Sequence, residues 1–324
     1  MDLMSSTTCP ICFNTNIDLI YNIPCSIFDQ SYLYENIKIV SCNHCGHVFN
    51  SLTETELNNL NKYYNEEYKN CNENSTTKKI DNGREEQLTK FLHGYQSVHV
   101  IDLSIEHIST PHTIFENITE PYLSIGAPDS VRYPEYTFFN PYWIIMREHI
   151  QHFDLLHLLL LAEMHKFKLE NFNLSSIPLM NKTMEIPIIT VLFKRVDHEV
   201  QSQNIDKDFF ILKTIIKNYI ECSIYNLKES LTKIPTNKHV YFWGIGREFL
   251  FINKFLNPNI NKILIDNNEY KQNNLTIGGI KIQDESLLKL ADSNSILILT
   301  ATAHKEVLKR KLKTFNFKGK VYSI

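Results

Sequence analysis

Two pairs of cysteines near the start of the chain constrain its fold more than any other feature. Each pair has the form CxxC, and 29 residues separate the two pairs: Cys9, Cys12, Cys42 and Cys45. Four thiolates complete the tetrahedral shell of Zn²⁺ and leave no open position, which is typical of a structural site. A segment of about 45 residues buries too little surface to fold alone, and bound zinc contributes on the order of 10–16 kcal/mol in finger peptides. We therefore predict a zinc-binding ribbon over residues 1–52.

The remaining cysteines and the nearby histidines leave alternatives to this site. Five of the seven cysteines precede residue 50, a distribution that favours metal over disulfides. The four cysteines could instead be ordinary reduced thiols, and His44 and His47 lie close enough to compete as ligands, although Cys45 completes the better pair. We interpret Cys25, Cys71 and Cys222 as buried thiols.

Charge and hydropathy bear on the partners of the protein. The formal net charge of -3 gives no electrostatic reason to expect nucleic acid or an anionic membrane surface. No apolar run approaches the roughly 18 residues that a membrane-spanning helix needs. The first residues carry no basic and apolar segments of the kind found in signal peptides. We expect a soluble, cytoplasmic protein that binds neither nucleic acid nor membrane.

Residues 53–196 read as helices followed by part of an α/β sheet. Thr53 with Glu56 three positions later forms a capping box, which predicts a helix over 52–68. Residues 70–83 are polar and read as a loop, and 84–92 as a short amphipathic helix. Apolar runs then predict strands with helices between them: Val98–Leu103, Leu123–Asp129 and Ile188–Phe193. This order is that of the second half of an α/β sheet domain.

The first half of that domain, where a cofactor would dock, is missing from the pattern. An α/β methyltransferase holds S-adenosylmethionine with a glycine-rich turn and the acidic end of the next strand. No glycine occurs between Gly94 and Gly126. Residues 84–97 are too few for a strand, loop, helix and second strand, which need about 30 residues. We therefore doubt that this chain binds S-adenosylmethionine.

The last part of the chain has the pattern of a compact βαβ domain. Residues 197–234 are predicted as a linker, polar over 197–208, followed by a long helix over 209–234. Residues 235–324 form the last domain, with strands and helices predicted at His239–Trp243, Arg247–Leu256, Lys262–Ile265, Ile296–Thr300, Lys305–Phe315 and Val321–Ile324.

A glycine turn in this domain imitates a dinucleotide-binding fingerprint. Gly244 and Gly246 follow a predicted strand, and Asp266 ends the next one, so these three residues are candidates for cofactor binding. Phe249 stands where the fingerprint has its third glycine and would crowd a pyrophosphate. The alternatives are a nicotinamide cofactor, or a tight turn whose amides face the phosphates of another ligand.

Glu148 and His149 are the candidate catalytic pair. They follow the aromatic run Phe138–Trp143, and histidine is the side chain whose ordinary pKa lies nearest neutrality, which suits a general base. The chain has 13 histidines, so a structural role is the alternative. Glu106 and His107 invite the same interpretation, but we expect Glu106 to cap or bridge locally.

The order of these signals resembles zinc-ribbon, three-domain sugar C-methyltransferases, which use S-adenosylmethionine to methylate nucleotide-linked keto-deoxysugars. Three blocks carry the resemblance: the cysteine pairs with Tyr64–Tyr68; Glu106–Ile108, Pro111, Pro128–Asp129, Phe139–Asn140, Glu148–His149 and Phe153; and Tyr241–Gly246, Ile265–Asn268, Gly279–Ile280 and Ile298–Leu299. The fold class that it implies is α/β, with an N-terminal zinc ribbon, a truncated Rossmann-like methyltransferase domain and a C-terminal Rossmann-like domain.

The resemblance implies that His149 removes the proton beside the sugar keto group, with Glu148 as its neighbour, and that the enolate then attacks the methyl donor. Without a donor site, reprotonation would make the protein an epimerase or isomerase. The resemblance also implies a nucleotide-linked sugar of the TDP type as partner, and the Gly244 turn would contribute to holding its nucleotide.

Three hypotheses for the function follow. The first is an enzyme of nucleotide-sugar modification, in deoxysugar or surface-glycan biosynthesis, that uses His149. The second is a non-catalytic scaffold or binding subunit, a pseudo-methyltransferase that keeps the zinc ribbon as an interaction surface. In the third, a partner chain supplies the missing half-domain.

Overall fold

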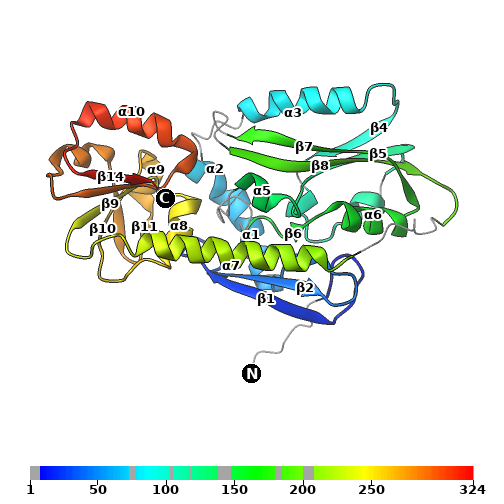
Figure 1. Ribbon diagram of the computed structural model, residues 1–324, viewed down its shortest axis with the longest axis horizontal. Helices are drawn as coiled ribbons and strands as arrows, with labels where there is room; N and C mark the ends of the chain where they lie inside the picture. Colours follow the sequence, from blue (N-terminus) through cyan, green and yellow to red (C-terminus); the bar gives the residue numbers. More distant parts are fainter. Residues whose placement is uncertain are drawn as a thin grey trace. The chain divides into compact units, whose positions relative to one another are not determined.

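We describe a computed structural model of the chain over residues 8–72, 78–102, 105–116, 118–137, 147–179, 184–199 and 208–323. The fold is mixed α/β, with three sheets among these residues (Figure 1). The chain divides into two compact units. The first unit comprises Met1–Asn22, Ile37–Leu52 and Thr76–Cys222, and the second comprises Ile23–Asn36, Thr53–Ser75 and Ser223–Ile324. Each unit is described below by itself.

The cysteine-rich segment forms a sheet that also takes in a strand from far along the chain. Its strands are β1 (Ile17–Pro24), β2 (Asn36–Cys42), β3 (Val48–Asn50) and β6 (Gln151–His152), in the order β1-β2-β3-β6. β3 is antiparallel to both β2 and β6, with Val48 opposite His152. The second cysteine pair therefore lies at the turn between β2 and β3, and β3 is hydrogen-bonded to a strand that begins two residues after His149.

The second sheet confirms the three strands predicted for the middle of the chain and adds a fourth. Its strands are β4 (Val98–Asp102), β5 (Tyr122–Pro128), β7 (Phe167–Leu179) and β8 (Met184–Arg195), in the order β4-β5-β8-β7. β4 and β5 are parallel, whereas β8 is antiparallel to β5 and to β7. β7 was not predicted, because most of its described residues are exposed and its sequence carries no continuous apolar run.

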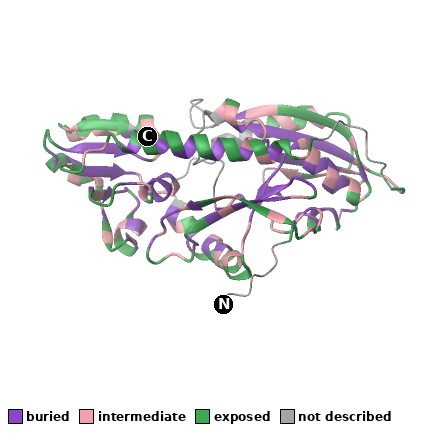
Figure 2. Ribbon diagram, turned by 60° about the horizontal axis from the view of Figure 1, so that its bottom comes forward, coloured by how far each residue is buried: buried purple, intermediate pink, exposed green. Residues whose placement is uncertain are grey.

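Helices cover both faces of this sheet, with α3 (Lys78–Phe91) and α6 (Leu155–Met164) on opposite sides (Figure 1). Alternation along β8 places Thr190 toward Arg84 of α3. Its neighbours Ile189 and Val191 pack in the buried core that includes Leu158 of α6. Figure 2 shows these central strands as buried. Short helices complete the unit: η1 (Ile105–His107), α4 (Thr113–Glu116) and α5 (Tyr133–Thr137).

The helices before this sheet correct one boundary. α1 (Glu54–Glu66) begins at Thr53 with the predicted capping box. α2 (Tyr68–Asn72) and the first turns of α3 fall in the stretch predicted as a loop, so that prediction is wrong for residues 70–72 and 78–83. The start of α3 was not predicted because its residues are mostly polar. The ion pair between Arg84 and Asp102 helps to hold this helix in place.

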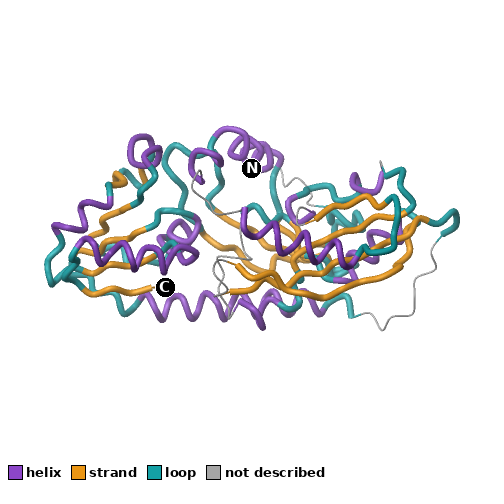
Figure 3. The backbone as a smooth tube through the Cα atoms, turned by 90° about the horizontal axis from the view of Figure 1, so that it is seen from above, coloured by secondary structure: helices purple, strands orange, loops and turns teal. Residues whose placement is uncertain are grey.

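The sheet of the second unit confirms the strands predicted after residue 235. β9 (His239–Trp243), β10 (Asn261–Ile265), β12 (Ile280–Gln283), β13 (Ile296–Leu299) and β14 (Lys320–Ser323) are parallel neighbours, and β11 (Thr276–Ile277) is antiparallel at one edge. Numbered along the chain, the parallel strands lie in the order 3-2-1-4-5. Strand order therefore reverses between β9 and β13. Figure 3 shows the strands side by side with helices at their flanks.

Helices pack on both faces of this sheet as well. Leu308 of α10 (Lys305–Phe315) packs with Trp243 and Leu297 on one face, together with η3 (Glu285–Leu290). On the other face, Phe249 of α8 (Arg247–Asn253) contacts Phe242, with ring centroids 5.2 Å apart. α9 (Glu269–Asn274) and η4 (Thr302–His304) lie in the connections.

The predicted long helix is α7 (Ile211–Leu231), whose buried residues recur every three or four positions. Most of the predicted linker before it, residues 200–207, lies outside the described residues. In the part of the chain that the structure describes, no helix is both long and apolar enough to cross a membrane.

Candidate functional sites

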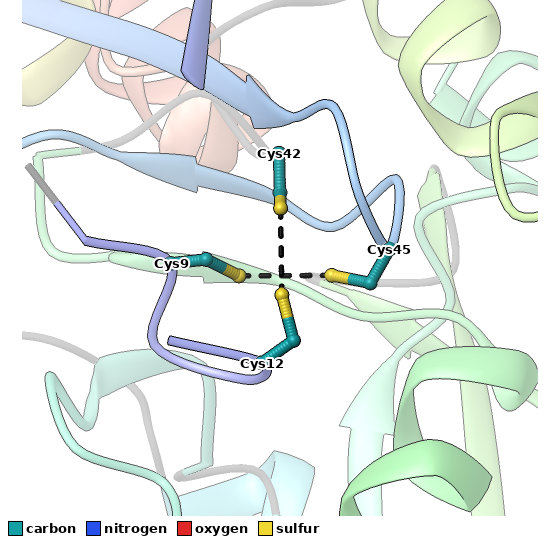
Figure 4. Close-up of side chains that lie close together, drawn as sticks. All are labelled: Cys9, Cys12, Cys42 and Cys45. Atoms are coloured by element: carbon teal, nitrogen blue, oxygen red, sulfur yellow. Dashed lines mark hydrogen bonds between the residues drawn. The ribbon is translucent and has the colours of Figure 1, made fainter. Parts of the chain in front are cut away.

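The four predicted cysteines converge in the first unit. Their Sγ atoms all lie within 4.8 Å of one another and point toward a common centre (Figure 4). The Sγ atoms of Cys9 and Cys45 are 3.6 Å apart, and those of Cys12 and Cys42 are 3.5 Å apart. Sulfurs at 2.3 Å from one tetrahedral Zn²⁺ would be separated by about 3.8 Å, whereas a disulfide is about 2.05 Å long. The cluster therefore fits a metal ion and not disulfides.

The local chain supports metal binding by these sulfurs. The backbone amide of His44 donates to Sγ of Cys42 at 3.4 Å, as expected where a turn presents a thiolate. A hydrogen bond from the Cys45 thiol lowers the pKa of Cys9 to about 5, whereas burial raises the pKa of Cys12 to about 11. His47 does not belong to this cluster of ligand atoms, and its Nε2 is hydrogen-bonded to Oε1 of Gln151 at 2.8 Å.

A histidine of α6 holds the second cysteine turn. Nε2 of His157 donates to the carbonyl of Cys45 at 2.9 Å, and its Nδ1 donates to Asp154, the N-cap of α6, at 2.7 Å. A ring that donates from both nitrogens is positively charged. Burial lowers the pKa of His157, but the charge and hydrogen bond of Asp154 outweigh it, and the pKa is raised.

A second histidine holds the first cysteine turn. Nε2 of His112 donates to the carbonyl of Ile11 at 2.8 Å, and its Nδ1 accepts from Nε2 of His165 at 2.6 Å. Each CxxC turn is thus tied to the α/β part of the unit by one imidazole. No local pattern pointed to His112 or His157, because their partners lie about a hundred residues earlier in the chain.

The predicted base His149 lies in a second cluster, with Glu106 and His107. Glu106 and His107 form η1, which directly follows β4, and His149 lies in the turn before β6. One potential ligand atom from each of the three side chains lies within 4.8 Å of the others. His149 is 8% exposed. Two histidines and a carboxylate at this spacing can transfer protons or hold a divalent cation.

His107 is fixed in orientation and tautomer. Its Nδ1 donates to the backbone carbonyl of Glu148 at 2.8 Å, so Nδ1 carries a proton and Nε2 is the nitrogen left to meet other groups. This Nε2 lies 3.7 Å from Oε1 of Glu106. The rings of His107 and His149 meet edge to face, with centroids 5.0 Å apart. Glu148 therefore contributes a backbone carbonyl to the cluster, whereas its predicted role as a carboxylate partner stays a prediction.

Glu106 is buried, with 4% of its surface exposed. We expected Glu106 to cap or bridge locally. Part of this expectation is met, because its carboxyl group accepts from the backbone amide of its own residue. Its Oε2 has no hydrogen-bond partner in the described part of the structure. Burial, helped by the negative charge of Asp102, raises the pKa of Glu106 to about 7. This carboxyl group can therefore hold a proton at neutral pH.

An internal ion pair fills the space at the carboxyl ends of β4 and β5. Nε of Arg84 donates to Asp102 at 2.9 Å, and Nη2 donates to Asp102 at 2.6 Å and to Thr190 at 2.7 Å. Gly126 on β5 leaves room for this pair, since a Cβ there would lie 1.8 Å from Oδ1 of Asp102. In the described residues β4 is the edge of its sheet, so this sheet contains no point at which strand order reverses.

In the second unit, the turn that contains Gly244 and Gly246 lies next to Asp266, and the polar groups of the two form hydrogen bonds with each other. The amide of Ile245 donates to Oδ2 of Asp266 at 2.7 Å. The buried Lys271, which sequence reasoning missed, donates to the same oxygen at 3.1 Å and to the carbonyl of Ile245 at 2.8 Å. Gly244 has a φ of +101°, and a Cβ there would lie 2.5 Å from Cβ of Ala301. The left-handed backbone and the close packing against Ala301 therefore explain the glycine at position 244 without a ligand.

Gly246 begins α8 with extended backbone, and a Cβ there would meet only Oε2 of Glu248, at 3.8 Å. Phe249, at the third position of the fingerprint, is fully buried in the core, so glycine is not needed for close packing there. Cofactor binding by Gly244, Gly246 and Asp266 stays a prediction. Comparisons of the sequence with models of known protein families and with curated proteins find no match.

Proposed function

We propose that this chain is an enzyme of nucleotide-sugar modification that moves a proton next to the carbonyl group of a nucleotide-linked keto sugar. The observation that carries the proposal is the cluster of Glu106, His107 and His149. It follows the carboxyl end of β4, the edge of an α/β sheet at which ligands bind. The base His149 and the neutral acid Glu106 lie there close enough to contact the same small group of a substrate.

The reaction needs no methyl donor. His149 takes the proton from the carbon beside the carbonyl, the electrons of that bond form the enolate, and a proton returns to carbon. Return to the opposite face gives an epimer. Where the carbon that lost its proton bears a hydroxyl group, the former carbonyl oxygen gains a proton to give an enediol; loss of that hydroxyl proton and protonation of the former carbonyl carbon then give an isomer. General base catalysis of such a step contributes about 10²–10⁴-fold to its rate.

Methyl transfer is the weaker alternative for this site. Doubly wound sheets bind their cofactors where strand order reverses, and the sheet of β4, β5, β7 and β8 has no such point among the described residues. Arg84 also occupies the space beside Asp102. The proposal therefore keeps the framework of the sugar C-methyltransferases, which the chain resembles, without their use of S-adenosylmethionine.

The proposal includes the finer fold assignments. Strand order 3-2-1-4-5 in the second unit is the order of doubly wound nucleotide-binding sheets, which favours a Rossmann-like domain over residues 235–324. The four-cysteine cluster favours a zinc ribbon over residues 1–52.

The test is solvent exchange. The full chain is incubated in deuterium oxide with TDP-linked keto-deoxyglucose, and deuterium at the carbons beside the carbonyl is followed by NMR and mass spectrometry. We expect exchange that falls at least about 100-fold in His149→Gln. The control is His99→Gln, since His99 lies on the same sheet but is partly exposed beside Glu120.

Binding measurements decide between the hypotheses. TDP binding with no exchange would contradict the enzymatic proposal and favour a non-catalytic binding subunit. Micromolar binding of S-adenosylmethionine would restore methyl transfer as the function. Binding of neither ligand would favour a scaffold.

A further inference from the structure

The buried carboxyl group of Glu106 needs a physical explanation. One of its oxygens, Oε2, has no partner in the described residues, and leaving a buried polar atom unpaired costs about 1–3 kcal/mol. The other oxygen approaches Nε2 of His107 only to 3.7 Å, which is too long for a hydrogen bond. Apart from its contact with the backbone amide of its own residue, this side chain is therefore buried without the bonds that a purely structural carboxyl group makes.

The distance to His149 suits one small substrate group. Glu106 and His149 present polar atoms within 4.8 Å of each other. A hydrogen bond to a reacting atom spans about 2.6–3.2 Å, so a keto oxygen and the carbon next to it can reach both residues at once.

We propose that Glu106 is a catalytic acid that donates its proton to the keto oxygen while His149 removes the proton from the neighbouring carbon. The inference rests on the proposed function. The C–H bond breaks, its electrons form a C=C bond, and the carbonyl oxygen takes the proton of Glu106 to give an enol. In the reverse sense the enol O–H returns its proton to Glu106, and carbon is protonated again. No oxidant or other reactant is needed.

The surroundings of Glu106 keep a proton available to it. Burial and the charge of Asp102 raise its pKa to about 7. The phenol of Tyr133 also lies close enough to interact with its charge, and burial raises the pKa of this phenol, so it stays neutral. Nδ1 of His107 keeps its proton on the carbonyl of Glu148, so this proton is not available as a competing donor. A carboxyl group poised near neutral pH suits proton transfer in both directions.

The experiment compares three variants of the full chain in the exchange assay with TDP-linked keto-deoxyglucose. Glu106→Leu removes the donor and should lower exchange about 100-fold. Glu106→Gln keeps an N–H donor that cannot transfer its proton, so its rate should lie between those of Glu106→Leu and the wild type. Glu135→Gln is the matched control, because Glu135 is exposed on the neighbouring helix α5. It should exchange at the wild-type rate.

A pH series adds a readout that a structural role would not move. Exchange by the wild type should decline above a pH of about 7, as Glu106 loses its proton, and this decline should be missing in Glu106→Gln.

The outcomes separate the two proposals. Exchange that continues at the wild-type rate in Glu106→Leu would overturn the role of Glu106 and leave the proposed function standing. No exchange by the wild type would overturn both. Exchange that appears only on addition of Zn²⁺ or Mn²⁺, and is lost in Glu106→Gln, would show that the three side chains hold a cation and would overturn the acid role.

Discussion

Burial and neighbouring charged groups decide the charge of several individual residues in this protein. Glu106 is driven toward its neutral form, whereas His157 is held in its charged form between Asp154 and the carbonyl of Cys45. Among the described residues neither ring nitrogen of the buried His152 has a hydrogen-bond partner, and burial lowers the pKa of His152 to about 4, so it is neutral. The same residue types on the surface would have ordinary charges, so each state is a property of the folded chain.

Glu106→Gln should make the protein more stable above neutral pH. In the folded chain this carboxyl group keeps its proton to a pH of about 7, whereas in the unfolded chain it loses it near 4.5. Between these values the unfolded state binds fewer protons, so stability falls as pH rises, by about 1.4 kcal/mol per unit for this group, and levels off above 7.

The gain of the glutamine variant over the wild type should therefore widen by about 2 kcal/mol between about pH 5 and pH 8. Urea unfolding of both proteins at the two pH values measures this difference. A gap that stays constant with pH would contradict the buried, neutral carboxyl group, and Glu135→Gln should show no such widening.

His157→Phe should weaken metal binding at the four cysteines. The substitution keeps an aromatic ring but removes the donor to the carbonyl of Cys45 and leaves Asp154 without its charged partner. Groups that orient the ligands of a metal typically contribute 10–100-fold to affinity, and we expect about tenfold here because the contact is to the backbone. Competition with a chelating dye measures it. The exposed His239 provides a control, and equal affinities for His157→Phe and His239→Phe would contradict the orienting role.

At the scale of elements, α3 and the β4–β5 pair are held together by one buried ion pair. Arg84 on α3 bonds to Asp102 at the end of β4 and to Thr190 on β8, so three elements meet at its guanidinium group. The pair fits because β5 has glycine at position 126.

Gly126→Ala should destabilise the first unit by about 3 kcal/mol or more. The added Cβ would lie 1.8 Å from Asp102 and 2.7 Å from Arg84, and breaking a buried ion pair costs about 3–5 kcal/mol. Ser124→Ala is the matched control on the same strand, because the buried Oγ of Ser124 has no hydrogen-bond partner in the described part of the chain and its removal should cost little. Thermal unfolding followed by circular dichroism measures both changes, and similar midpoints for the two variants would contradict the packing described here.

At the scale of the molecule, the four-cysteine cluster and the Glu106 cluster belong to one compact unit, and the sheet with parallel strand order 3-2-1-4-5 belongs to the other. β6 and the two histidine contacts connect the cysteine turns to the α/β part of the first unit. Loss of the metal should therefore destabilise these contacts as well as the cysteine turns themselves.

We expect about one zinc ion per chain, lost in the double variant Cys42→Ser and Cys45→Ser. In hydrogen exchange, that variant should lose protection at β3 and β6, because β3 follows the cysteine turn and pairs with β6. Protection of β9 and β13 in the second unit should be unchanged. Metal analysis gives the stoichiometry. A purified wild type without metal, or equal protection in both proteins, would contradict the structural role.

Local patterns in the sequence determined much of this structure. The CxxC spacing predicted the cysteine cluster, the capping box at Thr53 predicted α1, and apolar runs predicted β4, β5 and β9. These features depend on residues a few positions apart, so they can be read from the chain directly.

Contacts between distant residues could be decided only by the tertiary structure. β6 pairs with a strand about a hundred residues earlier in the chain. Arg84 forms hydrogen bonds with Asp102 and Thr190, and Glu106 is buried beside His149. The sequence predicted His149 as a base but assigned Glu106 only a local role, because burial and an unpaired oxygen result from packing. Proton affinity depends on solvent and neighbouring charge, which the order of residues does not specify until the chain has folded.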